Sequence, residues 1–315
     1  MVKIPNRNKT LCIGNEYDGS QAGHFSEEDI NRVLSNLKTR AIRYSITDDD
    51  IKKNKDKAVD LRTKGWLKLE GALSDKLDVI DSISRRLNFL LNGGKLDLES
   101  NLGRQDGENW TLYQPEARHN KLFLSIPEPL YNVPELAEII FHENLVSLAK
   151  SFFESMPAIG NLNLRKSFVN NLPSSSTTLF HIDPNSPFFL KAFVYLKDVD
   201  SIEDGPFTYV EGSVDEKPDN LLEYYRWSDE DIQSFYGRQR IKYLTAKKGD
   251  VIFAMTNGFH KGQKCKSKDR ELLTIDYVCH ADSWDTKDQL SIKKETFLNL
   301  PSDKVALTDF LNIKE

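Results

Sequence analysis

Three side chains in the second half of the sequence have the types and spacing needed to bind one metal ion. His181 and Asp183 are two residues apart, and on a β-strand such residues project to the same face. A second histidine, His260, follows the apolar run 250–254. Two histidines and one carboxylate that leave coordination positions open form the facial triad of non-haem Fe(II) oxygenases. The pattern therefore predicts an iron site at His181, Asp183 and His260, with open positions for a co-substrate and O2.

An arginine extends this constellation. Arg270 lies ten residues beyond His260 and opens the segment 271–278, which has the composition of a further strand. A buried guanidinium is the natural two-pronged partner of a carboxylate. The alternative is that His181 and His260 are ordinary polar residues of a sheet. The ordered succession of a His-x-Asp pair, a distal histidine after a second strand and an arginine opening a third disfavours that alternative.

The first half of the chain is expected to form helices that support this site. Capping patterns and apolar residues at helical spacing indicate the helices, and glycines after them indicate where they end. Residues 66–69 alternate like a short strand, and residues 95–130 read as a long loop. The expected helices cover 26–38, 48–64, 74–92 and 134–153.

From about residue 160 the pattern changes to short strands bounded by Gly, Pro, Asn or Asp. Several strands in succession without helices between them suggest an antiparallel jelly roll or barrel. Residues 215–240 interrupt this run with an acidic, aromatic insertion, in which a helix is expected between Ser228 and Gly237. The insertion is either a lid over the site or a helix covering a sheet edge. The expected strands cover 162–170, 187–196, 207–210, 250–255 and 271–278.

The fold class predicted is therefore α+β, mainly β with flanking N-terminal helices, in one domain spanning residues 1–315. No repeat or Pro/Ser-rich linker divides the chain. Its parts are an N-terminal arm with helices (1–56), a helical support (57–160), a jelly-roll core (161–285) that carries the 215–240 insertion, and a C-terminal extension (286–315).

Composition narrows the class of protein. The 315 residues carry a formal net charge of −5, with 39% hydrophobic and 29% charged residues, which is typical of a soluble globular protein. Mild acidity argues against a nucleic-acid partner, and no apolar run is long enough for a membrane helix. The N-terminus lacks a signal-peptide pattern, and three cysteines without a CxxC motif fit a reduced, cytoplasmic protein. The expected partner is a small molecule, and the oligomeric state stays open.

Over residues 57–280 these motifs resemble the phytanoyl-CoA dioxygenase-like family of Fe(II)/2-oxoglutarate-dependent oxygenases. The sequence departs from the usual family pattern at Glu211 and Val214, which flank a Gly-Ser pair, and this concerns the subfamily rather than the metal triad. The resemblance includes the entry segment 64–74, the helices around 134–153, the His-x-Asp pair, the loops 204–207 and 210–213, and the run 248–253 leading to His260 and Arg270.

The resemblance implies a double-stranded β-helix (a cupin-like jelly roll) with the catalytic Fe(II) bound by His181, Asp183 and His260. It implies that Arg270 binds the distal carboxylate of 2-oxoglutarate and that Phe193 is an aromatic residue near this co-substrate. The implied activity is O2-dependent hydroxylation of an unactivated C–H bond, with release of succinate and CO2.

Several alternatives remain open. The same cofactors also support desaturation, epimerisation or cyclisation. The chain could instead be a jelly roll that binds metal without turnover, or an oxygenase that modifies a protein or nucleic acid. The carboxylate at Asp183 argues against a halogenase, which has a small residue there. The basic run from Lys261 to Arg270 either attracts an anionic substrate or is a solvated loop. Lys166, Lys191 and Asn170 could face the pocket, but the register of their strands cannot be read from the sequence.

Overall fold

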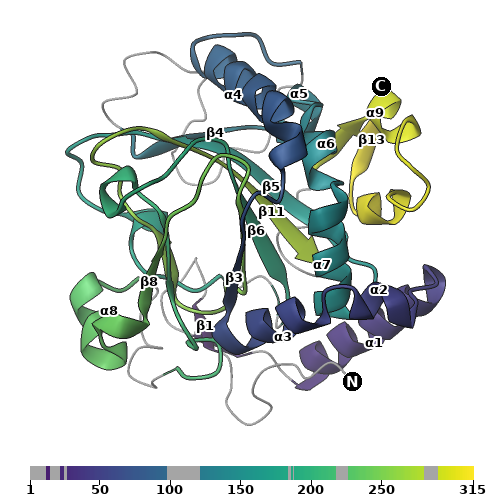
Figure 1. Cartoon of the computed structure of the whole chain (residues 1–315), viewed down its shortest axis with the longest axis horizontal. Coiled ribbons are helices and arrows are strands. Elements are labelled where there is room, and N and C mark those ends of the chain that lie inside the picture. The colour runs from purple at the N-terminus through teal and green to yellow at the C-terminus, as the bar shows by residue number, and fades with distance from the viewer. Residues whose placement is uncertain are drawn as a thin grey trace.

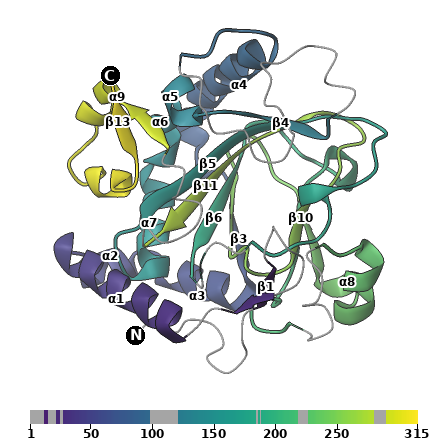
Figure 2. The ribbon, with the colours of Figure 1, turned by 180° about the vertical axis from the view of Figure 1, so that it is seen from behind.

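Two antiparallel sheets form the centre of the molecule (Figures 1 and 2). The computed structural model describes residues 12–14, 22–24, 27–97, 121–183, 186, 188–217, 226–279 and 290–315. The larger sheet has the strand order β3-β9-β6-β11-β5-β4, and every neighbouring pair in it is antiparallel. Its strands are β3 (Trp66–Leu69), β4 (Phe123–Ile126), β5 (Ala158–Ser167), β6 (Leu190–Tyr195), β9 (Val251–Ala254) and β11 (Arg270–Val278).

The smaller sheet lies opposite the larger one and has the order β10-β7-β8. Its strands are β7 (Phe207–Val210), β8 (Ile241–Leu244) and β10 (His260–Gly262). Single bridges pair His181 with His260 and Phe180 with Trp227, so the chain around residue 181 extends this sheet beyond β10. The interior between the two sheets is therefore bordered by the segments that carry both candidate histidines.

Helices cover the outer face of the larger sheet (Figure 1). The helices of the N-terminal half are α1 (Glu27–Arg43), α2 (Asp48–Lys52), α3 (Lys55–Lys64), α4 (Leu77–Leu91), α5 (Pro129–Asn132), α6 (Leu136–Ile140) and α7 (Glu143–Phe153). The apolar faces of the two long helices against the sheet, α4 and α7, explain this position, because their large apolar side chains recur on one side and are buried.

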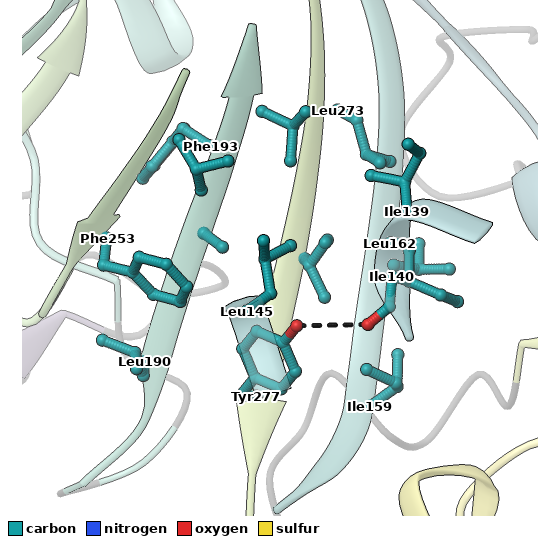
Figure 3. Packing of buried hydrophobic residues seen from close by; sticks show 14 of the residues in the cluster. Ile139, Ile140, Leu145, Ile159, Leu162, Leu190, Phe193, Phe253, Leu273 and Tyr277 are labelled. Carbon is teal, nitrogen blue, oxygen red and sulfur yellow. Dashed lines mark hydrogen bonds between the residues drawn. The ribbon is translucent and has the colours of Figure 1, made fainter. Parts of the chain in front are cut away.

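The main hydrophobic core lies between these helices and the sheet (Figure 3). Ile139, Ile140 and Leu145 pack against apolar side chains of four strands, and each of the three is fully buried. The hydroxyl of Tyr277 on β11 donates a hydrogen bond to the carbonyl of Ile140 at 3.3 Å, which satisfies a polar atom inside this core. The strand residues of the same cluster in the figure are Ile159, Leu162, Leu190, Phe253, Leu273 and Tyr277, together with Phe193, which lies on the face of β6 opposite to Leu190.

Shorter elements complete the described structure. The insertion contains α8 (Asp229–Tyr236), and the C-terminal segment contains β12 (Ser291–Lys293), α9 (Lys294–Leu298) and β13 (Asn312–Lys314). Near the N-terminus β1 (Cys12–Gly14) pairs with β2 (Ala22–His24). Within the described ranges, no helix is long and apolar enough to cross a bilayer.

The helices differ from expectation mainly in their breaks. The expected helix 48–64 is two helices, α2 and α3, and the expected helix 134–153 is also two, α6 and α7. In the second case His142 caps α7 by accepting a hydrogen bond from the backbone N–H of Asn144. That break is a local capping choice, which the continuous apolar pattern of 134–153 hides, whereas Asn54 before α3 makes no side-chain cap. The helix expected at 74–92 begins with a short 3₁₀ turn (Ser74–Lys76), and α4 follows it.

The strand prediction was right for five segments of the jelly roll but missed others. β4 lies within the segment 95–130 that was expected to be a loop, of which residues 98–120 fall outside the described structure. β8 and β10 were also missed, because four and three residues are too few to show the alternation that marks a strand. The helix expected between Ser228 and Gly237 is confirmed as α8, and its capping box joins Ser228 and Asp231.

Candidate functional site

The three predicted metal ligands come together at the edge of the smaller sheet. His181 and His260 face each other across an antiparallel bridge, with backbone hydrogen bonds of 2.9 and 3.0 Å in the two directions. The backbone N–H of Asp183 donates to the carbonyl of Thr256 at 2.8 Å, which holds Asp183 against the connection between β9 and β10. Backbone pairing therefore holds both ligand-bearing segments in register, independently of the ligands' side chains.

The side-chain geometry suits a shared cation. Oδ1 of Asp183 lies 3.6 Å from Nε2 of His181, and Oδ2 lies 3.5 Å from Nε2 of His260. Candidate ligand atoms of the three residues all lie within 4.8 Å of one another. Ligand–metal bonds are about 2.0–2.2 Å long, so atoms about 3–4 Å apart can share one ion. Across the described part of the chain, this is the one cluster of its kind that the structure contains.

Hydrogen bonds on the far side of each imidazole set its tautomer. Nδ1 of His181 lies 2.9 Å from the carbonyl of Leu179, and Nδ1 of His260 lies 3.0 Å from the carbonyl of Gly258. A carbonyl oxygen only accepts, so the proton sits on Nδ1 and the Nε2 lone pair points at the site. Burial, reinforced by the neighbouring His260, holds the pKa of His181 well below its usual range. Its imidazole is therefore neutral, as a metal ligand must be.

Gly258 is a glycine that this arrangement requires. A Cβ at this position would lie 2.1 Å from the hydroxyl oxygen of Tyr209 and 2.9 Å from the hydroxyl of Ser213. Both neighbours are buried, so the backbone would have to move, and the carbonyl that orients His260 would move with it. We expect Gly258→Ala to weaken metal binding about 10-fold or more, the usual effect of disturbing a ligand's hydrogen-bond partner, measured by calorimetric titration with Ni(II) or Co(II).

Gly160 on β5 offers a matched control for this prediction. A Cβ there would lie 2.9 Å from the buried side chain of Val278. Gly160→Ala should lower stability by about 1–3 kcal/mol through overpacking while it leaves metal affinity unchanged. Equal metal affinities for the Gly258→Ala variant and the wild type would contradict the role given to the Gly258 carbonyl.

Arg270 opens β11 as predicted, and its guanidinium is buried. Its terminal nitrogens donate to the carbonyl of Gly205 and to the hydroxyl of Ser167, the latter at 3.2 Å. Its Nε is buried without a hydrogen-bond partner among the described residues. No carboxylate in the described ranges forms an ion pair with Arg270. A buried cation with unused donor capacity is the group expected to bind a carboxylate ligand.

A second guanidinium, which the sequence analysis missed, borders the same space. Arg165 on β5 is two residues from Ser167, so both side chains project from the same face of the strand. It stacks over the Phe123 ring at 4.0 Å and donates to the hydroxyl of Thr177 at 3.2 Å. Burial and the nearby charge of Arg270 lower the pKa of Arg165 to about 10, so it stays positively charged at neutral pH. Arg165, Ser167 and Arg270 line one small cavity.

Lys191 faces the site, whereas Lys166 does not. Nζ of Lys191 lies 2.9 Å from Oδ2 of Asp183 and 3.3 Å from Oδ2 of Asp276. Burial raises the pKa of Asp183, but the ammonium of Lys191 opposes this effect, and the pKa is held well below its usual range. Lys166 points to the other face of the sheet and joins Glu271 in a buried polar network.

This network attaches α4 to the sheet next to Arg270. The carboxylate of Glu271 is fully buried and accepts hydrogen bonds from Ser84 and Asn88 of α4. Because adjacent residues of a strand face opposite ways, Glu271 holds the outer helix while Arg270 points inward. Asn170 lies away from the site and donates its side-chain amide to the carbonyl of Lys121.

Phe193 lies on the inward face of β6, with its ring 4.0 Å from that of Phe207 in a stacked arrangement. Phe207 in turn lies 5.7 Å from the His260 ring. Phe193 therefore contacts Phe207, and Phe207 lies between it and the ring of His260. Its contact with a co-substrate stays a prediction.

The basic run near His260 is largely neutralised by acidic partners. Lys261 is buried and forms an ion pair with Asp229 at 2.5 Å. Lys266 and Lys268, which are exposed, pair with Glu203 and Asp200. These pairings favour the interpretation of the run as an ordinary solvated loop around one buried lysine.

The insertion packs directly beside the metal ligands. Phe180 and Phe259, each next to a candidate histidine in the chain, belong to a small core with Trp227 and with α8. The Trp227 and Phe259 rings meet edge to face at 4.7 Å, and Asp229 at the start of α8 forms the ion pair with Lys261. In its described part, the insertion therefore supports the ligand-bearing segments from outside. Residues 218–225 lie outside the described structure.

Comparison with known proteins gives the fold. Neither a family model nor a curated protein matches the sequence. The epimerase SnoN, solved in complex with Fe3+, alpha-ketoglutarate and nogalamycin RO, is 18% identical with a TM-score of 0.51, over 70% of this chain and 81% of its own. Iron-bound HygX from Streptomyces hygroscopicus is 14% identical with a TM-score of 0.50, over 75% of this chain and 89% of its own.

The chain thus has the double-stranded β-helix fold of the non-haem iron/2-oxoglutarate-dependent enzymes, flanked by N-terminal helices, and the predicted fold class is confirmed. Membership of the narrower phytanoyl-CoA dioxygenase-like family stays a prediction.

Proposed function

We propose that this protein is an Fe(II)- and 2-oxoglutarate-dependent oxygenase that hydroxylates an unactivated C–H bond of a small molecule. The observation that carries the proposal is the convergence of His181, Asp183 and His260 within 4.8 Å, with both imidazoles oriented as ligands. The fold supports it, since SnoN and HygX share that fold and were solved with iron, SnoN also with alpha-ketoglutarate.

The residues present fit both groups. Two imidazoles with Nε2 directed at the site and one carboxylate suit Fe(II) and leave coordination positions open. The buried Arg270 suits the distal carboxylate of 2-oxoglutarate, because its Nε lacks a partner in the described structure and no described acid pairs with it. Arg165 adds a second positive charge to the same cavity.

Fe(II) bound here would supply the O2 activation that no side chain can provide. The overall reaction balances as R–H, O2 and 2-oxoglutarate going to R–OH, succinate and CO2. The chain's own contribution is placement. The two bridged segments fix the ligands, and Arg270 orients the co-substrate from its far end. The apolar residues Phe193 and Phe207 line the interior beside His260 and keep water from it.

The test is an anaerobic titration of the Fe(II)-loaded protein with 2-oxoglutarate. We expect the weak visible charge-transfer band that arises when a 2-oxo acid chelates Fe(II). We then expect O2-dependent succinate release that rises when a small-molecule substrate from a metabolite panel is added. Bound iron with no band on adding 2-oxoglutarate would contradict the co-substrate. Absence of iron binding would favour the alternative of a jelly roll without catalytic metal.

Product mass decides between hydroxylation and the related outcomes that use the same groups. Hydroxylation adds one oxygen atom, desaturation or cyclisation removes two hydrogens, and epimerisation leaves the mass unchanged. Epimerisation deserves the comparison because SnoN is an epimerase. A product that gains no oxygen would overturn the hydroxylase assignment and leave the proposed cofactors in place.

A further inference from the structure

Lys191 lies between two carboxylates at the candidate metal site, and one of them is a proposed ligand. Its Nζ is 2.9 Å from Oδ2 of Asp183 and 3.3 Å from Oδ2 of Asp276. The side chain of Lys191 is 15% exposed and that of Asp276 only 2%. The ammonium of a lysine in this environment is stabilised by the two carboxylates and little by water, so its contact with Asp183 is a fixed feature of the site.

The larger sheet fixes the position of this lysine. Lys191 on β6 and Asp276 on β11 are directly opposite each other in the antiparallel register. Directly opposed residues have their Cβ atoms about 4.5–5.5 Å apart on the same face. Asp183 belongs to a different segment, which is bonded to Thr256 through its backbone. The ammonium of Lys191 therefore links Asp183, at the edge of the smaller sheet, to the larger sheet.

The two oxygens of Asp183 consequently have different surroundings. Each oxygen lies near one imidazole, Oδ1 at 3.6 Å from Nε2 of His181 and Oδ2 at 3.5 Å from Nε2 of His260, but only Oδ2 also accepts a hydrogen bond from Lys191. We infer that Lys191 is a positioning residue that holds Oδ2, so that Asp183 binds the metal through Oδ1 alone. Asp276 balances the charge of the ammonium, so that an incoming divalent cation meets no net positive charge there. This inference rests on the metal site proposed above.

Charge and orientation must be separated in the test, because Lys191→Met changes both. Removing the positive charge favours cation binding, whereas losing the hydrogen bond disfavours it. The double variant Lys191→Met/Asp276→Asn removes one positive and one negative charge, so it leaves the net charge unchanged. We expect it to bind Co(II) about 10–100-fold more weakly than the wild type, the range found when the partner of a ligand is lost.

The visible spectrum of bound Co(II) gives a second readout, one that a purely structural role would not change. A carboxylate free to bind through both oxygens alters the coordination number, so the double variant should show a changed spectrum. Lys191→Arg, which keeps a donor and the charge, should restore most of the affinity and the wild-type spectrum. Lys68→Met is the control, since Lys68 also lies near two carboxylates, Glu70 and Asp250, but contacts none of the three ligands.

The outcomes are distinguishable. Wild-type affinity and an unchanged spectrum in the double variant would overturn the positioning role, while failure of the wild type to bind Co(II) would overturn the metal site itself. If the double variant does not fold, Lys191→Met and Lys191→Gln decide the question. Both lack the charge, but only the amide can donate to Asp183. Equal Co(II) affinities in these two variants would then overturn the inference.

Discussion

We expect replacement of His260 with alanine to abolish Fe(II) binding and turnover, and we expect the same result for His181 or Asp183. Each ligand atom lies within 4.8 Å of the other two, so one truncation leaves two ligands in a site that needs three. Loss of a ligand should lower metal affinity by more than the 10–100-fold caused by loss of a ligand's partner. Calorimetric titration with Fe(II) or Ni(II), followed by a succinate assay, measures both effects.

The fold should survive these substitutions. The bridge between residues 181 and 260 consists of backbone hydrogen bonds, which alanine retains. Circular dichroism and thermal unfolding should therefore remain close to those of the wild type. His142→Ala is the matched control, since His142 caps α7 and contacts Asp75, away from the site. It should lower stability by about 0.5–2 kcal/mol and leave iron binding intact. Full activity in Asp183→Ala would contradict the metal assignment.

The metal ligands could be predicted from the sequence because strand geometry is a good guide to an extended segment, even though only Phe180 and His181 of this segment form β-bridges. Residues two apart on a strand share a face, and that brought His181 and Asp183 together without any knowledge of the sheet. Placing His260 at the same site required a further assumption, namely that the strand after 250–254 pairs with the segment around residue 181. The sequence order of short strands indicated such a jelly roll, and the bridge between the two histidines realises it.

Arg165 and Lys191 could not be assigned in the same way. Their positions depend on strand register, and a shift of one residue moves a side chain to the opposite face. β6 is buried on both faces, so its apolar residues give no alternation from which to read the register. Lys166 shows the consequence, because it seemed as good a candidate as Lys191 but points toward α4. Alternation in β5 does put Arg165 and Ser167 on the same face of the strand. This places Arg165 at the site only when the contact between Ser167 and Arg270 is already known.

The insertion at 215–240 was open between a lid and a covering helix, and its described part fits neither description fully. α8 begins and ends where its capping residues predict. Its contacts, however, depend on Phe180 and Phe259, which became neighbours only when the two histidine segments paired. Local sequence thus determined the helix, while long-range pairing determined what it supports.

The second large effect is expected at Arg270, where a substitution should separate co-substrate binding from metal binding. Arg270→Leu removes a buried guanidinium that contacts no metal ligand directly, so Fe(II) affinity should stay near the wild-type value. Loss of one partner of a buried, hydrogen-bonded charge pair costs about 2–5 kcal/mol, which corresponds to roughly 30- to 5000-fold weaker 2-oxoglutarate binding. Anaerobic titration of the charge-transfer band in the variant measures this shift.

Two further variants show whether the fork of the guanidinium or burial alone is responsible. Arg270→Lys keeps the charge but not the two parallel donors, so its affinity should fall between those of Arg270→Leu and the wild type. Arg40 is buried to a similar extent, 7% exposed against 6%, but donates to the carbonyls of Met156 and Pro157 and pairs with Asp309. Arg40→Met should therefore destabilise the fold and leave 2-oxoglutarate affinity unchanged. If Arg40→Met weakened that affinity as much as Arg270→Leu, the loss would reflect general destabilisation, and Arg270 would no longer be the anchor of the co-substrate.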